Sequence, residues 1–196
     1  MTHLDELLSL HREIEQCRRC PLWKTRKNAV PGEGSAVADV MFVGEAPGAR
    51  EDEYGRPFVG RSGDLLTKLL AEIGLSRNDV FITSILKSHP PRNRPPIKLE
   101  IDACFPYLLK QFELIQPSVI VLLGSVAVSA VMGPWKMSDC HGRFYEGSDR
   151  VFFMTYHPAA ALRFPEVREV MRTDFAILKT HLDQVAVIST GTDSES

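Results

Sequence analysis

Cysteines are the residues of this sequence whose spacing most directly suggests chemistry. Cys17 and Cys20 form a Cys-x-x-Cys pair, and no second pair of this spacing follows. Cys104, which comes after a proline-rich segment, could complete a set of three. Thiolates are soft ligands that select zinc or an iron–sulfur cluster. The pair does not open a helix after a strand as a thioredoxin-type redox site does. A metal or cluster site and two unrelated thiols therefore both remain open.

An aromatic and a histidine stand in segments that glycine and proline make rigid. Phe58 lies in the glycine-bounded segment 55–60 (GRPFVG), where its ring could stack on a flat ligand instead of packing in the core. His157 follows an apolar run and precedes Pro158. A single histidine more often has a structural role, but this position favours a hydrogen-bonding or proton-transfer role.

Two short segments are basic and contain no acidic residue, namely 18–27 and 87–98. Their basic residues are Arg18, Arg19, Lys24, Arg26 and Lys27 in the first segment and Lys87, Arg92, Arg94 and Lys98 in the second. The chain as a whole has a formal net charge of −2, which excludes a uniformly basic nucleic-acid coat. Such runs are usually solvated faces, but two of them beside one site would suit contacts with a phosphate backbone.

The composition indicates one globular domain. The chain has 196 residues, of which 44% are hydrophobic and 24% are charged, values that exclude a disordered or fibrous protein. It contains no apolar run near the length that spans a bilayer, so we expect no membrane partner. The first ten residues, MTHLDELLSL, lack the basic start of a secretory signal. We therefore expect a cytoplasmic protein whose cysteines are thiols or metal ligands.

Strands and helices are expected to alternate along the chain. Short apolar runs predict four buried strands, at 40–43, 80–83, 119–123 and 151–155. Helical patterns cover residues 4–16, 64–73, 99–114, 125–132 and 167–182. This order predicts an α/β fold with a mostly parallel sheet that is covered on both faces. Without a linker or an internal repeat, we expect a single domain at residues 1–185 and a flexible C-terminal tail at 186–196.

The segments that follow the four predicted strands are rich in glycine, proline and polar residues. They are 44–48 (GEAPG), 84–91 (SILKSHPP), 124–125 (GS) and 156–158 (YHP). Because ligands bind at the carboxyl ends of the strands in open α/β sheets, these segments predict a binding site. The phosphate loop, the dinucleotide-binding glycines and the Gly-x-Ser-x-Gly elbow are all missing from the sequence.

Several of these motifs together resemble the family 4 uracil-DNA glycosylases. The similarity is carried by Cys-x-x-Cys-Pro-Leu at 17–22, Gly-Glu-Ala-Pro-Gly at 44–48, Glu51-Asp52, Gly-Arg-Pro-Phe-Val-Gly at 55–60, Pro-Pro-x-Asn-Arg at 90–94, Cys104, Leu-Leu-Gly-Ser-Val-Ala at 122–127 and His-Pro-Ala at 157–159. It runs in order from about residue 10 to residue 183.

The resemblance implies a three-layer α/β/α sandwich with a central four-stranded, mostly parallel sheet and a [4Fe–4S] cluster. It also implies a DNA-repair enzyme, which we expect to be a monomer, that flips uracil or another deaminated base out of DNA. The enzyme would hydrolyse the N-glycosidic bond and leave an abasic site. No lysine in the rim motifs is an obvious Schiff-base nucleophile, so we expect a monofunctional glycosylase.

By the same resemblance, His157 is the donor that stabilises negative charge on the departing base. Glu45, together with Glu51, would position a water. Phe58 would stack on the flipped base. Ala46 takes the place at which the most active glycosylase families carry a catalytic aspartate, so a strong general base is missing.

The resemblance also implies contacts with the DNA duplex. The segment that follows His157 is similar to the loop that wedges into the duplex, with Leu162 as the apolar filler and Arg163 beside it. Arg92 and Arg94 would bind the phosphate backbone. If the rim loops converge on a slot for an everted base, Phe58 and His157 should line a common cavity.

The sequence departs from the family pattern at two places. Ser84 replaces the usual asparagine, whose amide reads the base edge, so the base preference could be broader than uracil or different from it. The usual Lys-Cys-Arg-Pro-Pro reads Lys-Ser-His-Pro-Pro at 87–91, so the third of four cluster cysteines is lost. We expect His89 to join Cys17, Cys20 and Cys104 as the fourth ligand, since imidazole ligates iron in some clusters.

At the same position, Ser88 is a poorer alternative ligand. Cys140 matches no family ligand and is interpreted as structural or free. Two other functions remain open. One is a lesion-binding module of the same superfamily that has lost turnover, which the serine at position 84 suggests. The other is an unrelated hydrolase with a cluster or with a Cys₃His zinc site made of the same four residues.

Overall fold

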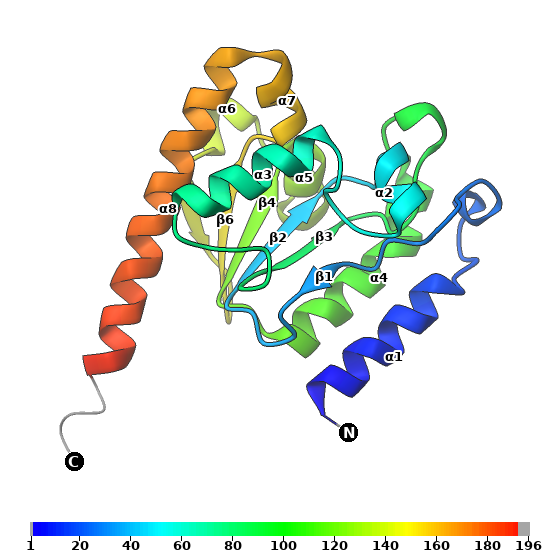
Figure 1. Cartoon of the computed structure of the whole chain (residues 1–196), viewed down its shortest axis with the longest axis horizontal. Coiled ribbons are helices and arrows are strands. Elements are labelled where there is room, and N and C mark those ends of the chain that lie inside the picture. The colour runs from blue at the N-terminus through cyan, green and yellow to red at the C-terminus, as the bar shows by residue number, and fades with distance from the viewer. Residues whose placement is uncertain (1, 192–196) are drawn as a thin grey trace.

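The four predicted strands form the centre of a six-stranded sheet with the order β1-β3-β2-β4-β6-β5 (Figure 1). The structure is a computed structural model, and it describes residues 2–191. The central strands are β2 (Val40–Gly44), β3 (Phe81–Ser84), β4 (Val119–Leu123) and β6 (Val151–Thr155). All three pairings among them are parallel, which confirms the predicted parallel sheet.

Helices connect the strands and cover both faces of the sheet. They are α1 (His3–Glu15), α2 (Ala49–Tyr54), α3 (Arg61–Glu72), α4 (Lys98–Ile115), α5 (Ser125–Met132), α6 (Met137–Cys140), α7 (Pro158–Arg163) and α8 (Pro165–Gly191). Two short 3₁₀ helices, η1 (Pro21–Lys24) and η2 (Pro91–Asn93), lie in loops. The resulting α/β/α sandwich confirms the predicted fold class.

Alternating residues of the strands supply two separate cores. In β2, Met41 and Val43 belong to a buried cluster with side chains of α1, α4 and α5. Val40 and Phe42 of the same strand belong to a second cluster, with side chains of α3 and α8. Successive side chains of a strand point to opposite faces, so a strand that is apolar throughout its length requires helices on both sides.

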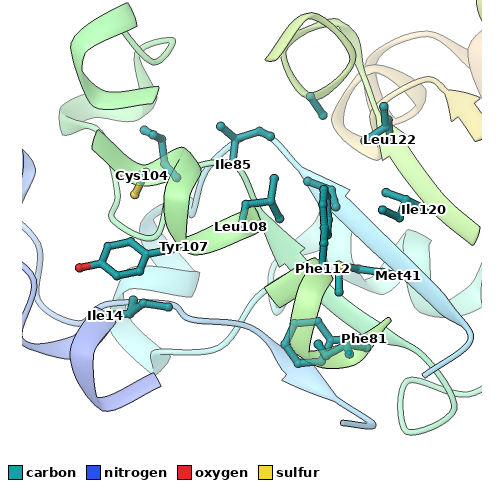
Figure 2. Close-up of a cluster of buried hydrophobic side chains, with 14 of the residues drawn as sticks. Ile14, Met41, Phe81, Ile85, Cys104, Tyr107, Leu108, Phe112, Ile120 and Leu122 are labelled. Carbon is teal, nitrogen blue, oxygen red and sulfur yellow. The ribbon is translucent and has the colours of Figure 1, made fainter. Parts of the chain in front are cut away.

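The first of these cores extends to one of the predicted metal-ligating residues. Figure 2 shows Leu108 and Phe112 of α4 in this cluster, together with strand residues such as Met41. Cys104 lies on α4 at the edge of the cluster, and its side chain is 5% exposed. The position of the sheet-covering helix α4 therefore determines where this sulfur lies.

Three features differ from the expected arrangement. The antiparallel edge strands β1 (Glu33–Gly34) and β5 (Arg143–Glu146) extend the predicted four strands to six. Both strands are short and lack a continuous apolar run. Each lies at an edge of the sheet, pairs with one neighbour only, and has no buried residue. Helix α8 continues to Gly191, past the expected end of the domain at residue 185. Residues 192–196 of the predicted flexible tail lie outside the described residues.

Among the helices of residues 2–191, none combines the length and the apolar character that crossing a membrane requires.

Candidate active site and cysteine cavity

A cleft of about 540 Å³ opens beyond the carboxyl ends of β2, β3 and β6. The loops after β2 and β6 contribute Glu45 and His157 to its lining, the end of β3 contributes Ser84, and the segment before α3 contributes Phe58. The ring centroids of Phe58 and His157 are 5.7 Å apart, with their planes inclined by 30°. The expectation that these two rings line one cavity is confirmed.

The backbone at Phe58 has a conformation that few residues other than glycine adopt. Its φ angle is 51°, in the left-handed region, and its side chain is 8% exposed. Close approaches by two glycines make room for it. A Cβ atom at Gly63 would lie 1.8 Å from the carbonyl oxygen of Phe58, and one at Gly44 would lie 2.7 Å from its Cζ atom. The left-handed conformation costs about 1–2 kcal/mol, so other contacts must hold this loop in place.

Two charged side chains hold the Phe58 loop from opposite sides. The carboxylate of Glu51 accepts hydrogen bonds from the backbone N–H groups of Val59 and Gly60, each at 2.9 Å. The guanidinium of Arg77 donates to the carbonyl oxygens of Pro57, at 2.6 Å, and of Phe58, at 3.0 Å. Loop atoms on both sides of the aromatic ring are thus fixed by charge-assisted hydrogen bonds.

Glu51 was expected to help position a water, but its hydrogen bonds give it a structural task. In addition to its bonds to the Phe58 loop, its Oε2 atom accepts from the N–H of Gly48 at 3.1 Å. Both carboxylate oxygens are therefore engaged by the backbone. The residue joins the loop after β2 to the Phe58 loop, and its role toward a water stays a prediction.

Arg77 is fixed by an ion pair of its own. Its Nη2 and Nε atoms lie 2.5 and 3.0 Å from Oε1 of Glu33, on the edge strand β1, and Arg56 binds the other oxygen of this carboxylate at 2.7 Å. Burial opposes ionisation of Glu33, but the hydrogen bonds from the two arginines outweigh it and lower the pKa of the carboxyl. Sequence reasoning missed Arg77, because no motif links it to a segment 20 residues earlier.

His157 is held as a neutral imidazole with one nitrogen directed by the backbone. It is the N-cap residue of α7, and its Nδ1 atom accepts a hydrogen bond from the N–H of Ala159 at 3.1 Å. With Nδ1 as acceptor, the proton of the neutral ring is on Nε2. Burial lowers the pKa of His157 to about 4, although the negative charge of Glu51 opposes this shift. The side chain is thus a neutral N–H donor at neutral pH.

Glu45 and Ala46 line the cleft next to each other, as expected from the motif at 44–48. Burial raises the pKa of the Glu45 carboxyl. Ala46 contributes only a methyl group. Of the two acidic residues that line the cleft, Glu51 is bound by backbone N–H groups, whereas the carboxylate of Glu45 is not. A carboxylate in this position can accept a proton from a water or stabilise nearby positive charge.

Ser84 ends β3 and is 5% exposed in the wall of the cleft. Its Oγ atom would lie 3.3 Å from a Cβ atom at Gly44, so the wall is tightly packed here. A hydroxyl offers one donor and acceptor lone pairs, fewer directed groups than an amide. The structure brings Ser84 to the predicted base-binding position.

The second basic segment is only partly a surface patch. Lys87 is 1% exposed, and its Nζ atom donates to Gln111 Oε1 at 2.7 Å and to the carbonyl oxygen of Ser84 at 2.7 Å. The prediction that Lys87 contributes to a phosphate-binding surface is therefore wrong, because its ammonium group is not at the surface. The internal acceptors offset the free-energy cost of removing this group from water. Lys98 is exposed and pairs with Asp102.

The two predicted DNA-binding arginines of this segment have different environments. Arg94 lines the cleft, but it forms a two-point ion pair with Glu100, at 2.9 and 2.5 Å, and Glu100 is 1% exposed. Arg92 is exposed in a left-handed conformation with a φ angle of 58°. Arg92 forms no ion pair within residues 2–191, so its guanidinium is available to solvent.

The predicted wedge residues lie on α7 and do not line the cleft. Leu162 is half-buried, Arg163 is exposed, and the guanidinium of Arg163 lies 5.9 Å from the ring centroid of Phe164. Phe164, which caps the helix, is 48% exposed. The sequence analysis did not single out Phe164. Its position directly before Pro165, at the end of a short helix, could have indicated an exposed ring.

Two more arginines at the cleft also escaped the sequence analysis. Arg50 and Arg61 line it and are exposed at the starts of α2 and α3. Each stands one or two residues after a glycine of a recognised motif, a position that could have indicated them. Their charges, together with that of Arg92 beside the lining residue Asn93, give the cleft a positive rim although the chain has a net charge of −2.

A second cavity brings the three predicted cluster cysteines together. Cys17 and Cys20, from the segment between α1 and η1, and Cys104, from α4, all line it. Burial raises the pKa of the thiols of Cys20 and Cys104, which argues against a reactive redox pair, since such thiols have lowered pKa values. Cys140 is buried elsewhere as a free thiol, in agreement with its structural interpretation.

Ser88 also lines this cavity, whereas His89 does not. The Nε2 atom of His89 lies 2.8 Å from Oδ1 of Asn93, and its Nδ1 atom lies 3.9 Å from Oδ2 of Asp52. The structure therefore does not bring the His89 imidazole to the three cysteines, because its two ring nitrogens face Asn93 and Asp52 instead. Within residues 2–191, no three His, Cys, Asp or Glu side chains form a group that could hold a single metal ion.

Comparisons with known proteins agree with this geometry. Residues 31–179 match the family model described as Uracil DNA glycosylase superfamily. A Type-4 uracil-DNA glycosylase of Saccharolobus solfataricus is 48% identical over 91% of this chain and 88% of its own length. Proteins of the same name from Pyrobaculum aerophilum and Thermotoga maritima are 46% and 41% identical, over 88% and 91% of this chain and 92% and 96% of their own lengths. The chain belongs to the uracil DNA glycosylase superfamily and, within it, to the type-4 uracil-DNA glycosylases.

Proposed function

We propose that this protein is a monofunctional DNA-repair glycosylase that hydrolyses the N-glycosidic bond of uracil, or of another deaminated base, flipped out of DNA. The observation that carries the proposal is the pairing of the Phe58 ring with the neutral His157 imidazole in one cleft, at a centroid distance of 5.7 Å. A flat base can stack on the first ring while the second donates a hydrogen bond to it. The names of the similar proteins support uracil as the base.

Cleavage of the bond leaves negative charge on the base and positive charge on the sugar. Nε2–H of His157, which lines the cleft, is left as the donor of the ring because the N–H of Ala159 occupies Nδ1. A neutral donor stabilises charge that develops on a base oxygen without having to lose its own proton. Glu45 would stabilise the sugar cation and orient the attacking water, and the missing carboxylate at Ala46 makes a slower reaction the expected outcome.

DNA binding would rely on the positive rim of the cleft. Arg50 and Arg61 are exposed there, Arg92 is exposed beside the lining residue Asn93, and each of the three can contact a phosphate. The exposed end of α7, with Leu162, Arg163 and Phe164, would fill the space that the flipped base leaves in the duplex. The partner is then DNA that contains the lesion, with affinity that falls as salt rises.

The test is base release from an oligonucleotide that carries a single uracil, with hypoxanthine and xanthine oligonucleotides measured in parallel. We expect release of uracil by the wild-type protein, and a loss of about 10²–10³-fold in the single-turnover rate for His157→Ala, the size of effect seen when one such donor is removed. Absence of release from all three substrates by correctly folded protein would refute the proposal.

A base-binding protein without turnover is the second candidate. It is favoured by Ser84, whose hydroxyl cannot make the two directed hydrogen bonds of an amide with the base edge. Lesion-selective binding in a gel-shift assay, together with no base release, would establish this alternative instead of the enzyme.

We further propose that Cys17, Cys20 and Cys104 hold a [4Fe–4S] cluster. Their common cavity supports this, as do two backbone N–H groups that point at sulfur, that of Arg19 at 3.4 Å from Cys17 and that of Lys87 at 3.3 Å from Cys104. Such hydrogen bonds offset the negative charge of ligated thiolates. When bound, the cluster would fasten the segment after α1 to α4 and would take no part in the hydrolysis. Iron and sulfide analysis of anaerobically purified protein tests this assignment.

We also propose that the protein acts as a monomer in the cytoplasm. The cleft is complete within one chain, which supports the first part of this proposal. Light scattering after size-exclusion chromatography, with and without a uracil oligonucleotide, would detect a dimer if one forms.

A further inference from the structure

Ser88 occupies the place in the cysteine cavity that a fourth ligand would take. Its side chain is 3% exposed, and it lines the same cavity as Cys17, Cys20 and Cys104. The backbone N–H of the preceding residue already points at the sulfur of Cys104. Because the next residue, His89, bonds to Asn93 outside this cavity, Ser88 is the nearest candidate along this segment.

A half-buried cation lies beside the Ser88 hydroxyl. Nη1 of Arg26 donates a hydrogen bond to Ser88 Oγ at 2.8 Å. Its Nη2 atom is held by the carbonyl oxygens of Glu15, at 2.6 Å, and Cys17, at 3.1 Å. The guanidinium is therefore fixed in orientation, with its remaining side directed at the serine oxygen.

The guanidinium of Arg26 has no acidic partner in the described part of the chain. No carboxylate forms an ion pair with it within residues 2–191, where its other acceptors are neutral carbonyl groups. A partly buried cation normally requires an anion nearby. A neutral serine hydroxyl does not meet this requirement, but a serine oxygen that has lost its proton to a metal does, because it carries a negative charge.

We propose that Ser88 is the fourth protein ligand of the cluster, bound through Oγ and stabilised by the hydrogen bond from Arg26. This inference rests on the proposed [4Fe–4S] cofactor. Ligation forms one iron–oxygen bond and breaks the O–H bond of the serine, the proton passes to solvent, and no iron changes its oxidation state. One iron then differs from the other three in its ligand. Since oxygen is a harder ligand than sulfur, this iron is the one that leaves most readily.

Four variants test the assignment after anaerobic reconstitution with iron and sulfide. In Ser88→Ala the fourth iron loses its protein ligand, so we expect iron release to a chelator to accelerate about tenfold or more, as when other metal-supporting residues are removed. Ser88→Cys should restore a thiolate and slow the release below the wild-type rate. Arg26→Gln should also accelerate iron release, but by a smaller factor than Ser88→Ala. His89→Ala is the matched control and should release iron at the wild-type rate.

Spectroscopy provides a second measurement that does not depend on activity. Mössbauer spectra of the ⁵⁷Fe-reconstituted wild-type protein should contain one iron site distinct from the rest, and this site should merge with the others in Ser88→Cys. Electron spin-echo spectra of the reduced cluster should lack the nitrogen coupling of a histidine ligand. A nitrogen coupling that disappears in His89→Ala, or iron release unchanged in Ser88→Ala, would overturn the proposal.

The failure of this inference can be told apart from failure of the cofactor assignment. If the wild-type protein retains neither iron nor sulfide, both the cluster and its fourth ligand are refuted, while the uracil-release assay still decides the glycosylase function. If the cluster forms in wild type and persists unchanged in Ser88→Ala, only the role of Ser88 is refuted.

Discussion

Replacing Arg77 by Met should impair base excision although Arg77 does not line the cleft. The side chain holds the carbonyl oxygens of Pro57 and Phe58, at 2.6 and 3.0 Å. Methionine fills similar space but donates no hydrogen bond. The Phe58 loop would keep its bonds to Glu51 on the other side and would lose its restraint on this one.

The magnitude follows from two opposing free energies. The left-handed conformation of Phe58 costs about 1–2 kcal/mol, whereas two hydrogen bonds from a charged donor each contribute about 1.5–3 kcal/mol. Without them the strained conformation is no longer strongly favoured. The largest loss possible through Phe58 is that of base stacking itself, about 1–3 kcal/mol. Since about 1.4 kcal/mol corresponds to tenfold, we expect kcat/KM to fall by about 10- to 100-fold.

The assay is uracil release from a short oligonucleotide under kcat/KM conditions, with the melting temperature of each variant as a check on folding. Arg56→Met is the matched control, because Arg56 binds the same Glu33 carboxylate but contacts neither loop carbonyl, and it should change kcat/KM less than twofold. Arg77→Lys should recover part of the activity, since it restores the charge without the two-point geometry.

A double-mutant cycle decides whether Arg77 acts through the aromatic ring. If it does, the combination of Arg77→Met with Phe58→Ala should be no slower than Phe58→Ala alone. Additive losses in the cycle, or a full loss of activity in Arg56→Met, would refute the reasoning that Arg77 positions Phe58.

Four further predictions concern individual side chains of the site. Because the pKa of His157 is about 4, protonation of this imidazole should reduce the rate of base release only as pH falls toward 4, whereas the raised pKa of Glu45 adds a decline at higher pH. The fold should lose stability between pH 6.5 and pH 4, since the unfolded chain takes up the histidine proton first. A titration midpoint of His157 near pH 6.5, measured by NMR, would contradict this. Arg92→Ala should reduce the salt dependence of DNA binding by about one unit of slope, with an unchanged melting temperature. Arg94→Ala should instead lower the melting temperature, because it leaves the carboxylate of Glu100 buried without its partner. Ser84→Asn should increase the preference for uracil over hypoxanthine in a competition assay if the amide can reach the base edge.

Much of the fold could be predicted from local sequence because the central strands are buried on both faces. Strand β4, at Val119–Leu123, and strand β6, at Val151–Thr155, have the bounds that the apolar runs indicated. The edge strand β5 could not be found in this way, since none of its four residues is buried and its pairing depends on a neighbouring strand.

The sequence by itself determined the chemical inventory of this protein. The motifs around Glu45, Phe58 and His157 are local, and each follows a strand or opens a helix, so the parallel sheet had to gather them at one edge. The Cys17 and Cys20 pair is a local motif as well, since its spacing alone indicated a metal or cluster site. Residue type and order along the chain were sufficient for these conclusions.

Only the tertiary structure decided which of these groups are free to act. Lys87 and Arg94 look like surface cations in the sequence, but contacts with Gln111 and Glu100 take the first into the interior and neutralise the second. Whether Ser88 or its neighbour reaches the cysteine cavity depends on the direction of one side chain. These outcomes follow from partners that are distant in the chain, which no local pattern encodes.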